Sequence, residues 1–493
     1  MKKVVIEPVT RVEGHGKVTL QVDEQGKVQE ARLHIVEFRG FERFIEGRPY
    51  WELPLVVQRL CGICPVSHHL AAAKAIDQIA GVSQLSPPAE KLRRLLHWGQ
   101  TLQSHALHFF HLASPDLLFG FSSEAAKRNI VAVIEAHPDL ALQGVKLRKY
   151  GQDIIQAISG KKVHGIAAIP GGMNRSLTPD QNQALQQPLP DIIQWARNAV
   201  QIARQLYEQD PALNADFATL STPWMSLVNQ NGDWEIYDGN LRVKEPDGRL
   251  FKDQYPCDDY TQLIHEEVKS WSYMKFPFLV DKGMDSGWYR VGPLARINNC
   301  DRFATPLAEA ERQSLLASTD NGVCQATLAY HWARMIELLH CAESIQMILS
   351  DSDLISDDLQ RHGHHQRGGT RTGIGVIEAP RGTLFHHYEV NGDDQVTMAN
   401  LIVSTTSNNR AMNESIRKVA DDHLSGRELT PELLNLIEVA IRAYDPCLSC
   451  ATHAVGKMPL QLELVDAQGH RQDLMTRNHT GELTRHTSVD HAP

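Results

Sequence analysis

The sequence predicts a mainly α-helical protein of the α+β class, in which a multihelical core carries small antiparallel β-sheets at its edges. Three observations support this fold. Apolar and polar residues alternate in the first 36 residues, helical periodicity dominates residues 51–350, and alternation returns after residue 384. With 42% hydrophobic and 22% charged residues, the 493-residue chain can bury a large core.

The first half of the chain is expected to pass from strands to helices. VVIEP, KVTLQVD and VQEARLHIVEF alternate as strands with one buried face do, and EQGK provides a turn. Ser86-Pro87-Pro88 is a strong helix start, since proline suits the first helical turn. Apolar residues at helical spacing predict long helices over residues 86–110, 137–158, 179–209 and about 320–349.

The second half begins with a polar, Gly- and His-rich stretch, residues 351–373, that predicts a surface loop. The spacing of its histidines fits no defined metal site, so a solvated loop is favoured over metal binding. Strands are expected at 384–390 and 396–403, joined by the turn NGDD. A last helix should begin at Thr430-Pro431 and end at Asp445-Pro446, because the residue before proline avoids the helical conformation.

We expect residues 1–453 to form a single large domain. Its parts are a β-rich segment (1–50), a mainly helical segment (51–350) and a final segment (374–453) in which strands precede a metal-binding helix end. Residues 454–493 would form a C-terminal tail. There is no internal repeat at a solenoid period.

Charge and hydropathy exclude several classes of partner. The formal net charge is −10 and no basic cluster occurs, which argues against nucleic acid and against an anionic membrane surface. No apolar stretch approaches the roughly 18–20 residues that span a bilayer, and the N-terminus lacks the apolar segment of a signal peptide. We therefore expect no direct membrane insertion and a cytoplasmic location, the alternative being export together with a partner that carries a signal.

Four of the eight cysteines form two CxxC pairs, Cys61 with Cys64 and Cys447 with Cys450. Two intervening residues let both sulfurs of a pair face one ion, and four soft thiolates suit zinc, iron–sulfur clusters or nickel. A structural zinc site is the plain alternative. Against it, 382 residues separate the pairs, and a histidine follows each pair at a position suited to tune sulfur basicity. The other four cysteines are expected to be small buried apolar residues: Cys257, Cys300, Cys324 and Cys341.

The motifs around the pairs resemble those of the [NiFe]-hydrogenase large subunits. That family carries RxCGxCxxxH and DPCxxCxxH, and both are complete here at residues 59–68 and 445–453. The resemblance continues over nearly the whole chain in RVEGHG (11–16), FRGFE (38–42), PGGMN (170–174), EAPRG (378–382) and STTSNN (404–409). Three longer segments resemble the cytoplasmic bidirectional, NAD-reducing branch in particular: WSYMKFP (271–277), YRVGPLARIN (289–298) and EAPRGTLFHHY (378–388).

The resemblance implies a bimetal site and a reaction. Cys61 and Cys447 would be terminal ligands of nickel, while Cys64 and Cys450 would bridge nickel to an iron that carries carbon monoxide and cyanide. Thiolates donate charge to nickel, which eases changes of its oxidation state. Heterolytic cleavage of H2 needs a hydride acceptor and a nearby base, and the implied base is the Cys447 thiolate. The implied activity is reversible cleavage of H2 into protons and electrons.

Two further motif positions imply roles in catalysis. Glu13 matches the proton-relay glutamate of the family and would carry the proton away from Cys447. Arg381 would lie over the iron, where its guanidinium could hydrogen-bond a cyanide and assist H–H cleavage, and Asp445 would orient it. Taken alone, Glu13 would be a solvated or capping carboxylate, and Arg381 a surface ion-pair partner.

Other matching residues imply binding roles. Ser404 and Thr405 would donate hydrogen bonds to a second cyanide, although by themselves they are two edge-strand hydroxyls. His68 would contact the metal-binding thiolates from outside. Glu42 and His453 would bind a structural magnesium; carboxylate oxygen suits this ion well, whereas imidazole is less usual.

The sequence departs from the family at one place and extends beyond its motifs at another. Many members have an Asp-His pair where this chain has Ser104-His105, so a proton route or oxygen tolerance that depends on the acid does not carry over. The 40 residues after His453 resemble the tail that a maturation protease removes once nickel chaperones have loaded the site.

The electrons must leave through partners. The CxxC cysteines are all committed to the metals, which implies an iron–sulfur small subunit. No GxGxxG after a strand and no GxxxxGK[ST] occurs, so reduction of NAD would need diaphorase subunits that carry FMN. Two related alternatives remain: an H2-sensing regulatory hydrogenase, and the quinone-site subunit of NADH–quinone oxidoreductases. The intact four-cysteine set argues against the second.

Overall fold

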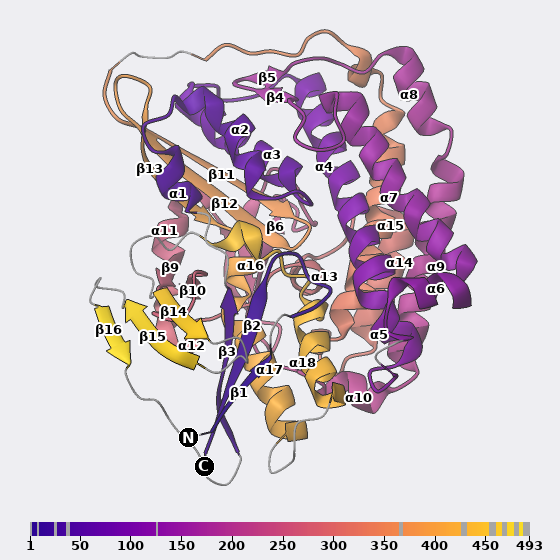
Figure 1. Cartoon of the computed structure of the whole chain (residues 1–493). Coiled ribbons are helices and arrows are strands. Elements are labelled where there is room, and N and C mark those ends of the chain that lie inside the picture. Colours follow the sequence, from indigo (N-terminus) through magenta and orange to yellow (C-terminus); the bar gives the residue numbers. More distant parts are fainter. Residues whose placement is uncertain are drawn as a thin grey trace.

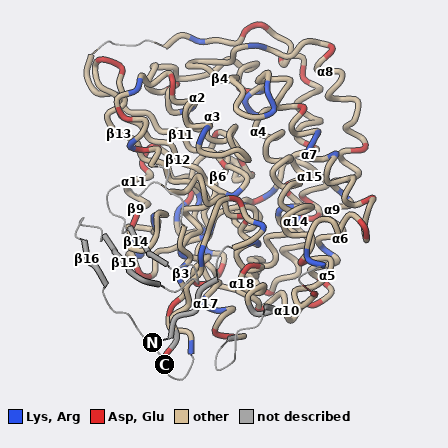
Figure 2. Tube along the Cα trace, viewed as in Figure 1, with Lys and Arg blue, Asp and Glu red and all other residues tan. Residues whose placement is uncertain are grey.

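The computed structural model describes residues 2–6, 9–23, 27–35, 40–124, 127–363, 368–424, 431–452, 460–465, 471–477 and 483–486. Long helices gather on the right of the view in Figure 1, and the antiparallel sheets lie to the left and centre. This is the α+β architecture that the sequence predicts. None of the described helices is both long and apolar enough to cross a membrane. Acidic and basic residues are interspersed along the trace in Figure 2.

The N-terminal strands form an antiparallel sheet in chain order, as predicted: β1 (Lys2–Ile6), β2 (Gly16–Val22) and β3 (Val28–Ile35). The inward face of this sheet buries Val18, Leu20 and Leu33. β3 packs against α17 (Asn409–Leu424), where the Asn413 side chain accepts a hydrogen bond from the Leu33 amide at 2.7 Å. The sheet thereby joins the start of the chain to its C-terminal part.

The helical layer is built on α4 (Pro87–Leu107), which begins where expected, with the Ser86 hydroxyl accepting from the Ala89 amide. It continues as one π-helical stretch (His108–Ala113) and then α5 (Ser114–Phe119). α4 packs against α7 (Pro138–Ser159) and α15 (Ala329–Leu349). Other helices are α1 (Phe41–Ile45), α2 (Leu53–Val56), α6 (Ile130–Ala136), α10 (Pro211–Asp216), α11 (Tyr260–Leu263), α12 (Gly283–Ser286), α13 (Pro293–Asn299) and α14 (Pro306–Ala317).

Two predicted helix boundaries are wrong. The helix expected from about Asp320 begins nine residues later, because Gly322 adopts a left-handed φ of 71° and the Asn321 side chain accepts from the Val323 amide in a turn. The helix expected over 179–209 is two helices, α8 (Pro179–Gln186) and α9 (Leu189–Glu208). Pro188 lacks the amide hydrogen that a continuous helix would need there.

Two sheets lie within the segment expected to be mainly helical. β6 (Trp224–Val228), β7 (Asn240–Lys244) and β8 (Leu250–Tyr255) form one, and β9 (Ile264–Glu267) pairs with β10 (Phe276–Leu279) in the other. Every residue of β6 is buried, so this strand shows no alternation of apolar and polar residues. β4 (Ala168–Ile169) and β5 (Gly172–Met173) form a small hairpin.

Another sheet, formed by β11 to β13, supports the metal-binding segments. β11 (Arg371–Ala379), β12 (Gly382–Val390) and β13 (Val396–Ile402) are antiparallel, and the last two match the predicted hairpin. β11 packs against α3 (Pro65–Ile79), which starts directly after Cys64. The approach is close enough to require glycine, since a Cβ on Gly375 would lie 1.9 Å from the Ala71 carbonyl oxygen.

The last helix is α18 (Pro431–Ala443), and it ends before Asp445-Pro446 as predicted, whereas Thr430 lies outside the described residues. The stretch 351–373 is mostly irregular, although Leu354 is buried, and residues 364–367 with two of its histidines are outside the described residues. The tail contributes a separate antiparallel sheet of β14 (Leu460–Val465), β15 (Arg471–Arg477) and β16 (Leu483–His486).

Candidate metal centre

The two CxxC pairs meet in the interior of the fold. Cys61 follows a single helical turn, and Cys64 immediately precedes α3, with Pro65 in the first helical position. Cys447 and Cys450 follow α18. The four sulfur atoms all lie within 4.8 Å of one another, at 3.1 Å between Cys61 and Cys447 and 3.9 Å between Cys64 and Cys450. The geometry is that of one four-thiolate metal-binding site.

The environment shifts the pKa values of the four thiols in opposite directions. All four are at most 5% exposed. Burial raises the pKa of Cys447 and Cys450 well above the usual thiol value. Hydrogen bonds from Cys447 and Cys450 lower the pKa of Cys61 and bring the pKa of Cys64 to about 6. A soft metal that replaces the shared protons would satisfy all four sulfurs at once.

A small cavity of about 10 Å³ adjoins the sulfurs. Its walls are mostly apolar, and its polar lining comes from Ser67, His68, Arg381, Ser404 and Thr405. It touches Cys64, Cys447 and Cys450 but not Cys61. A small, nearly dry space with few polar groups suits compact ligands on a metal better than an organic substrate.

Arg381 points its charge into this region from the turn between β11 and β12. It is 3% exposed, so it is not a surface ion-pair partner. Its Nη2 donates to the Asp445 carboxylate at 3.0 Å, and its Nε donates to the Asp445 carbonyl. Burial opposes the positive charge, but Asp445 and the thiolates of Cys447 and Cys64 outweigh it and raise the pKa of Arg381. The guanidinium therefore stays charged and fixed beside the sulfurs.

The two hydroxyls beside the cavity differ in what they offer. Both belong to α16 (Ser404–Ser407). Ser404 donates its hydrogen to the Gly382 carbonyl at 2.6 Å. Thr405 instead accepts from the Cys447 amide at 3.0 Å, which leaves its own hydrogen to donate. Of the two hydroxyls expected to bind cyanide, Thr405 is the one with a hydrogen not already committed in the fold.

Glu13 lies directly against the C-terminal pair. Its carbonyl oxygen accepts from the Leu448 amide at 3.1 Å, and its Oε2 accepts from the Ser449 amide at 3.1 Å. Gly14 permits this contact, because a Cβ there would lie 2.9 Å from Leu448 Cβ, and its φ is 84°. The carboxylate of Glu13 is thus bound to the loop between Cys447 and Cys450 and lies beside both in space.

Comparison with known proteins decides the family. Residues 39–136 and 237–453 match the family described as nickel-dependent hydrogenase, and residues 3–38 match the family described as HoxL-like. The chain belongs to the nickel-dependent hydrogenase family. It is 44% identical to the NAD-reducing hydrogenase HoxS subunit beta of Cupriavidus necator, over 97% of this chain and 100% of that protein. It is 41% identical to one subunit of the F420-non-reducing hydrogenase of Methanothermobacter marburgensis, over 97% and 100%.

Solved structures agree with this family assignment. A crystal structure of an NAD+-reducing [NiFe]-hydrogenase in the H2-reduced state superimposes with a TM-score of 0.89 at 54% identity, covering 92% of this chain and 100% of that one. The Ni-Fe-Se hydrogenase of D. vulgaris Hildenborough shares the fold at 22% identity and a TM-score of 0.73, with the same coverage of both chains. Membership of a nickel-dependent family sets aside a purely structural zinc site.

Other residues expected near the hydrogenase site occupy distinct places. His68 is buried on α3 and lines the cavity, and its Nδ1 lies 3.0 Å from His386 Nε2. His386 in turn bonds Tyr388. Sequence reasoning assigned no role to His386 or Tyr388, although both lie in a motif quoted for the resemblance, and the period of two along β12 places them on one face.

A carboxylate from another helix contacts His105, while Ser104 stands where other family members have the acid. Ser104 lies next to Arg381, with 3.5 Å between Oγ and Nη1. His105 Nε2 contacts Glu337 of α15 at 2.9 Å, and Glu337 is also paired with Arg296 at 2.5 Å. Burial lowers the pKa of His105 to about 4. Sequence reasoning missed Glu337, because it lies 232 residues away from His105.

Glu42 lies apart from the sulfurs, in a cluster with Lys275 and Glu266. Lys275 Nζ is 3.0 Å from Glu42 and 3.3 Å from Glu266, and the Leu401 amide donates to Glu42 at 2.9 Å. Burial raises the pKa of Glu42, and Lys275 opposes that shift. His453 lies outside the described residues. Of the four single cysteines, three are buried as expected, whereas Cys257 is half-buried and donates to the Gly239 carbonyl.

Proposed function

We propose that this chain is the catalytic subunit of a [NiFe]-hydrogenase that cleaves H2 reversibly into protons and electrons. The observation that carries the proposal is the convergence of four buried sulfurs within 4.8 Å beside a small cavity with a fixed guanidinium. The bound nickel–iron pair, with carbon monoxide and cyanide on iron, supplies the redox and hydride-accepting chemistry. The donor set fits, because four thiolates can serve two soft metals as two terminal and two bridging ligands.

The cavity agrees with part of the assignment of ligands. Cys64, Cys447 and Cys450 border the cavity, and Cys61 does not. If the cavity holds the diatomic ligands of the iron, Cys64 and Cys450 would serve as the bridging thiolates and Cys61 as a terminal ligand of nickel, while the terminal role of Cys447 rests on the family motif. Arg381 and Thr405, which line the cavity, would then donate hydrogen bonds to the cyanides.

Residues of this chain accept the proton of H2 and transfer it away from the metals. The Cys447 thiolate takes the proton of H2, and the Glu13 carboxylate beside Leu448 and Ser449 carries it onward. Arg381, which stays charged, stabilises negative charge that develops over the cavity as the H–H bond breaks. Its two hydrogen bonds to Asp445 fix the guanidinium in place.

The electrons pass to partners. In the part of the chain that the structure describes, the four cysteines are the one group of three or more His, Cys, Asp and Glu side chains that lie close enough to hold a metal together. An iron–sulfur small subunit therefore receives the electrons. The relative at 44% identity is an NAD-reducing hydrogenase, which supports NAD as the final acceptor. Diaphorase subunits with FMN and a cytoplasmic location are proposed with it.

Magnesium is proposed at Glu42. The Glu42–Lys275–Glu266 cluster combines two carboxylates with one ammonium, so a negative charge remains for a hard cation with oxygen ligands. Elemental analysis of the purified protein should find one magnesium per chain, and Glu42→Gln should abolish it. Retention of magnesium by that variant would contradict the assignment.

The tail after His453 is proposed to be removed during maturation, by a protease that acts after nickel chaperones have loaded the site. The family match ends at residue 453. The solved NAD+-reducing chain is fully covered yet leaves 8% of this chain unmatched, about 39 of 493 residues. Mass spectrometry should find His453 at the C-terminus in nickel-replete cells and the full chain in nickel-starved cells; an identical mass in both would contradict this.

Infrared spectroscopy of nickel-loaded protein tests the central proposal. Iron-bound carbon monoxide and cyanide should give stretching bands that no amino acid has, and H2 should drive dye and NAD reduction. Cys447→Ser should abolish turnover, whereas Cys341→Ser, at a buried thiol outside the site, should not. Absence of the bands would contradict the assignment. Bands with very little turnover would indicate a sensor in place of an enzyme.

A further inference from the structure

The loop that carries Glu13 begins in an unfavourable backbone conformation. Arg11 has a φ of 53°, in the left-handed region that a residue with a Cβ rarely adopts. Gly14 follows at 84°. A strained non-glycine residue persists only where neighbouring contacts hold it. The contacts around Arg11 therefore decide where Glu13 lies.

The side chains of Arg11 and Arg442 both pair with the carboxylate of Asp116 and hold the backbone at Thr10 and Arg11 in place. Arg11 donates to the Leu112 carbonyl at 2.9 Å and pairs with Asp116 Oδ1 at 2.6 Å. Arg442 pairs with Asp116 Oδ2 at 2.8 Å, and its Nε and Nη2 both donate to the Thr10 carbonyl at 3.0 Å. We call Asp116, Arg11 and Arg442 the Asp116 clamp.

The clamp is buried and its charge is balanced. The side chains of Asp116 and Arg442 are 3% and 1% exposed, and that of Arg11 is 18% exposed. Glu438 supplies the second negative charge, at 2.7 Å from Arg442, and it also accepts from the Thr10 amide at 2.6 Å. Loss of the Asp116 charge would leave one buried cation unmatched, which low-dielectric surroundings penalise.

The clamp joins three elements, one of which, α18, leads to the metal centre. Asp116 lies on α5, and Leu112 lies on the π-helical stretch that extends α4. Arg442 is in the last turn of α18, five residues before Cys447. One carboxylate thus ties the beginning of the Glu13 loop to the helix that delivers the C-terminal cysteines.

We propose that Asp116 is a positioning residue for Glu13: by bridging Arg11 and Arg442 it holds the Thr10–Glu13 segment against the Cys447–Cys450 loop. The consequence for proton transfer rests on the relay role of Glu13 in the proposed function. The geometric part does not, because the contacts that fix the loop exist whatever Glu13 does.

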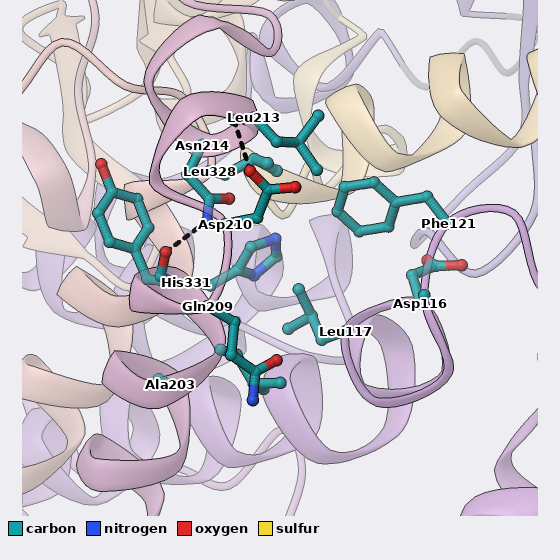
Figure 3. A pocket seen from close by; sticks show the side chains of 13 residues that line it. Asp116, Leu117, Phe121, Ala203, Gln209, Asp210, Leu213, Asn214, Leu328 and His331 are labelled. Atoms are coloured by element: carbon teal, nitrogen blue, oxygen red, sulfur yellow. Dashed lines mark hydrogen bonds between the residues drawn. The ribbon is translucent and has the colours of Figure 1, made fainter.

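The surroundings of Asp116 determine which substitution is informative. Asp116 lies on the wall of a cavity of about 210 Å³ with Leu117, Phe121 and His331 (Figure 3). Truncation to alanine would join this cavity to the clamp and admit water. Asp116→Asn keeps the size of the side chain and removes its charge, so it weakens the two ion pairs without enlarging the cavity.

The test compares holoenzymes. In Asp116→Asn, nickel content and the infrared bands should match those of the wild type, while H/D exchange of H2 falls by about 10- to 100-fold, as expected for a displacement of about an ångström. The matched control is Asp77→Asn. Asp77 is a buried carboxylate paired with Arg93 at 2.6 Å, roughly 20 Å along α3 from Cys64, and its loss should leave exchange unchanged.

Amide hydrogen exchange measured by mass spectrometry separates the positioning role of Asp116 from the proton-relay role of Glu13. Asp116→Asn should increase deuterium uptake in a peptide that covers residues 9–16, and Asp77→Asn should not. Unchanged uptake in that peptide would overturn the proposal. If Glu13→Gln slows H/D exchange and Asp116→Asn does not, the clamp plays no positioning role; if Glu13→Gln has no effect, the relay fails and the peptide uptake alone decides about the clamp.

A second variant covers the case in which Asp116→Asn does not load nickel. Thr10→Val removes the hydroxyl that accepts from Arg442 at 2.9 Å and donates to Glu438 at 3.1 Å, with little change of volume. It should raise the amide deuterium uptake of residues 9–16. It should also slow H/D exchange of H2, by a smaller factor than Asp116→Asn does, and leave the infrared bands unchanged. Wild-type values of both would overturn the proposal.

Discussion

A single buried guanidinium illustrates how the site is tuned at the scale of a residue. Arg381 keeps its charge although it is buried, because Asp445 and the sulfurs lie beside it. Its fork of donors reaches the carbonyl and the carboxylate of the same residue, Asp445. The ammonium group of a lysine is a point charge on a flexible chain, so it cannot make both contacts with Asp445 and also face the cavity.

Arg381→Lys should therefore lose activity while it keeps its metals. We expect H2-dependent dye reduction to fall by about 100-fold or more, comparable to loss of a preorganised donor in other active sites. Nickel content should be unchanged. Arg93→Lys, at another buried arginine paired with an aspartate, is the control and should retain turnover. A lysine variant with normal turnover would show that Arg381 is only structural.

Residue types and spacing suffice to predict some of the site but not all of it. The four cysteines could be predicted to share a site because each CxxC pair is already a clamp for one ion. Glu337, His386 and Lys275 could not, because their partners lie on other elements and no local spacing marks them. Ser404 shows the same limit: its sequence does not reveal that Gly382 takes its hydrogen.

At the scale of elements, prediction succeeded where local signals are strong. The start of α4 follows from Ser86 and two prolines, and the β12–β13 hairpin from its polar turn. β6 was missed because tertiary contacts bury both of its faces and remove the alternation. The prediction of a single helix over 179–209 was wrong. The helical periodicity of the sequence continues through Pro188, but the backbone cannot form a continuous helix there.

The contact between α4 and α7 depends on two glycines, Gly99 and Gly151. A Cβ on Gly151 would lie 2.3 Å from the Gly99 carbonyl oxygen and 2.7 Å from Gln103 Cβ. We expect Gly151→Ala to lower the free energy of unfolding by about 1–3 kcal/mol, despite the better helix propensity of alanine. Thermal unfolding measures the effect. Gln156→Ala on the exposed face of α7 should change stability little, and equal stability of both variants would refute close packing here.

At the scale of the whole molecule, the metal centre is where the two ends of the described core meet. The segment after β1, the start of α3, the β11–β12 turn and the end of α18 all converge on it. No part of the chain could hold the four sulfurs alone, since 382 residues separate the pairs. Metal binding and global folding are therefore coupled, and conditions that loosen the helical core should also release the metals.

Buried histidines make the core sensitive to acid. Burial lowers the pKa of His97, His331 and His340 to about 3, and that of His69 to about 4. The unfolded chain takes up these protons near pH 6.5, so the stabilisation is complete above that pH and is lost as the pH falls towards 4. Each histidine should contribute a slope of about 1.4 kcal/mol per pH unit in that window.

His340→Gln tests the pH dependence that one buried histidine, outside the metal centre, contributes to the free energy of unfolding. Its Nδ1 bonds the Thr305 hydroxyl at 2.7 Å, a contact that a glutamine amide can keep. At pH 7.5 the variant should be less stable than the wild type, because the ring packs against Trp98 and Trp234. Between pH 6.5 and 4.5 the gap in unfolding free energy should narrow by about 1.4 kcal/mol per unit, because glutamine has no proton to gain. Denaturant titrations at several pH values measure the gap, and a constant difference would mean that His340 is not held neutral by burial.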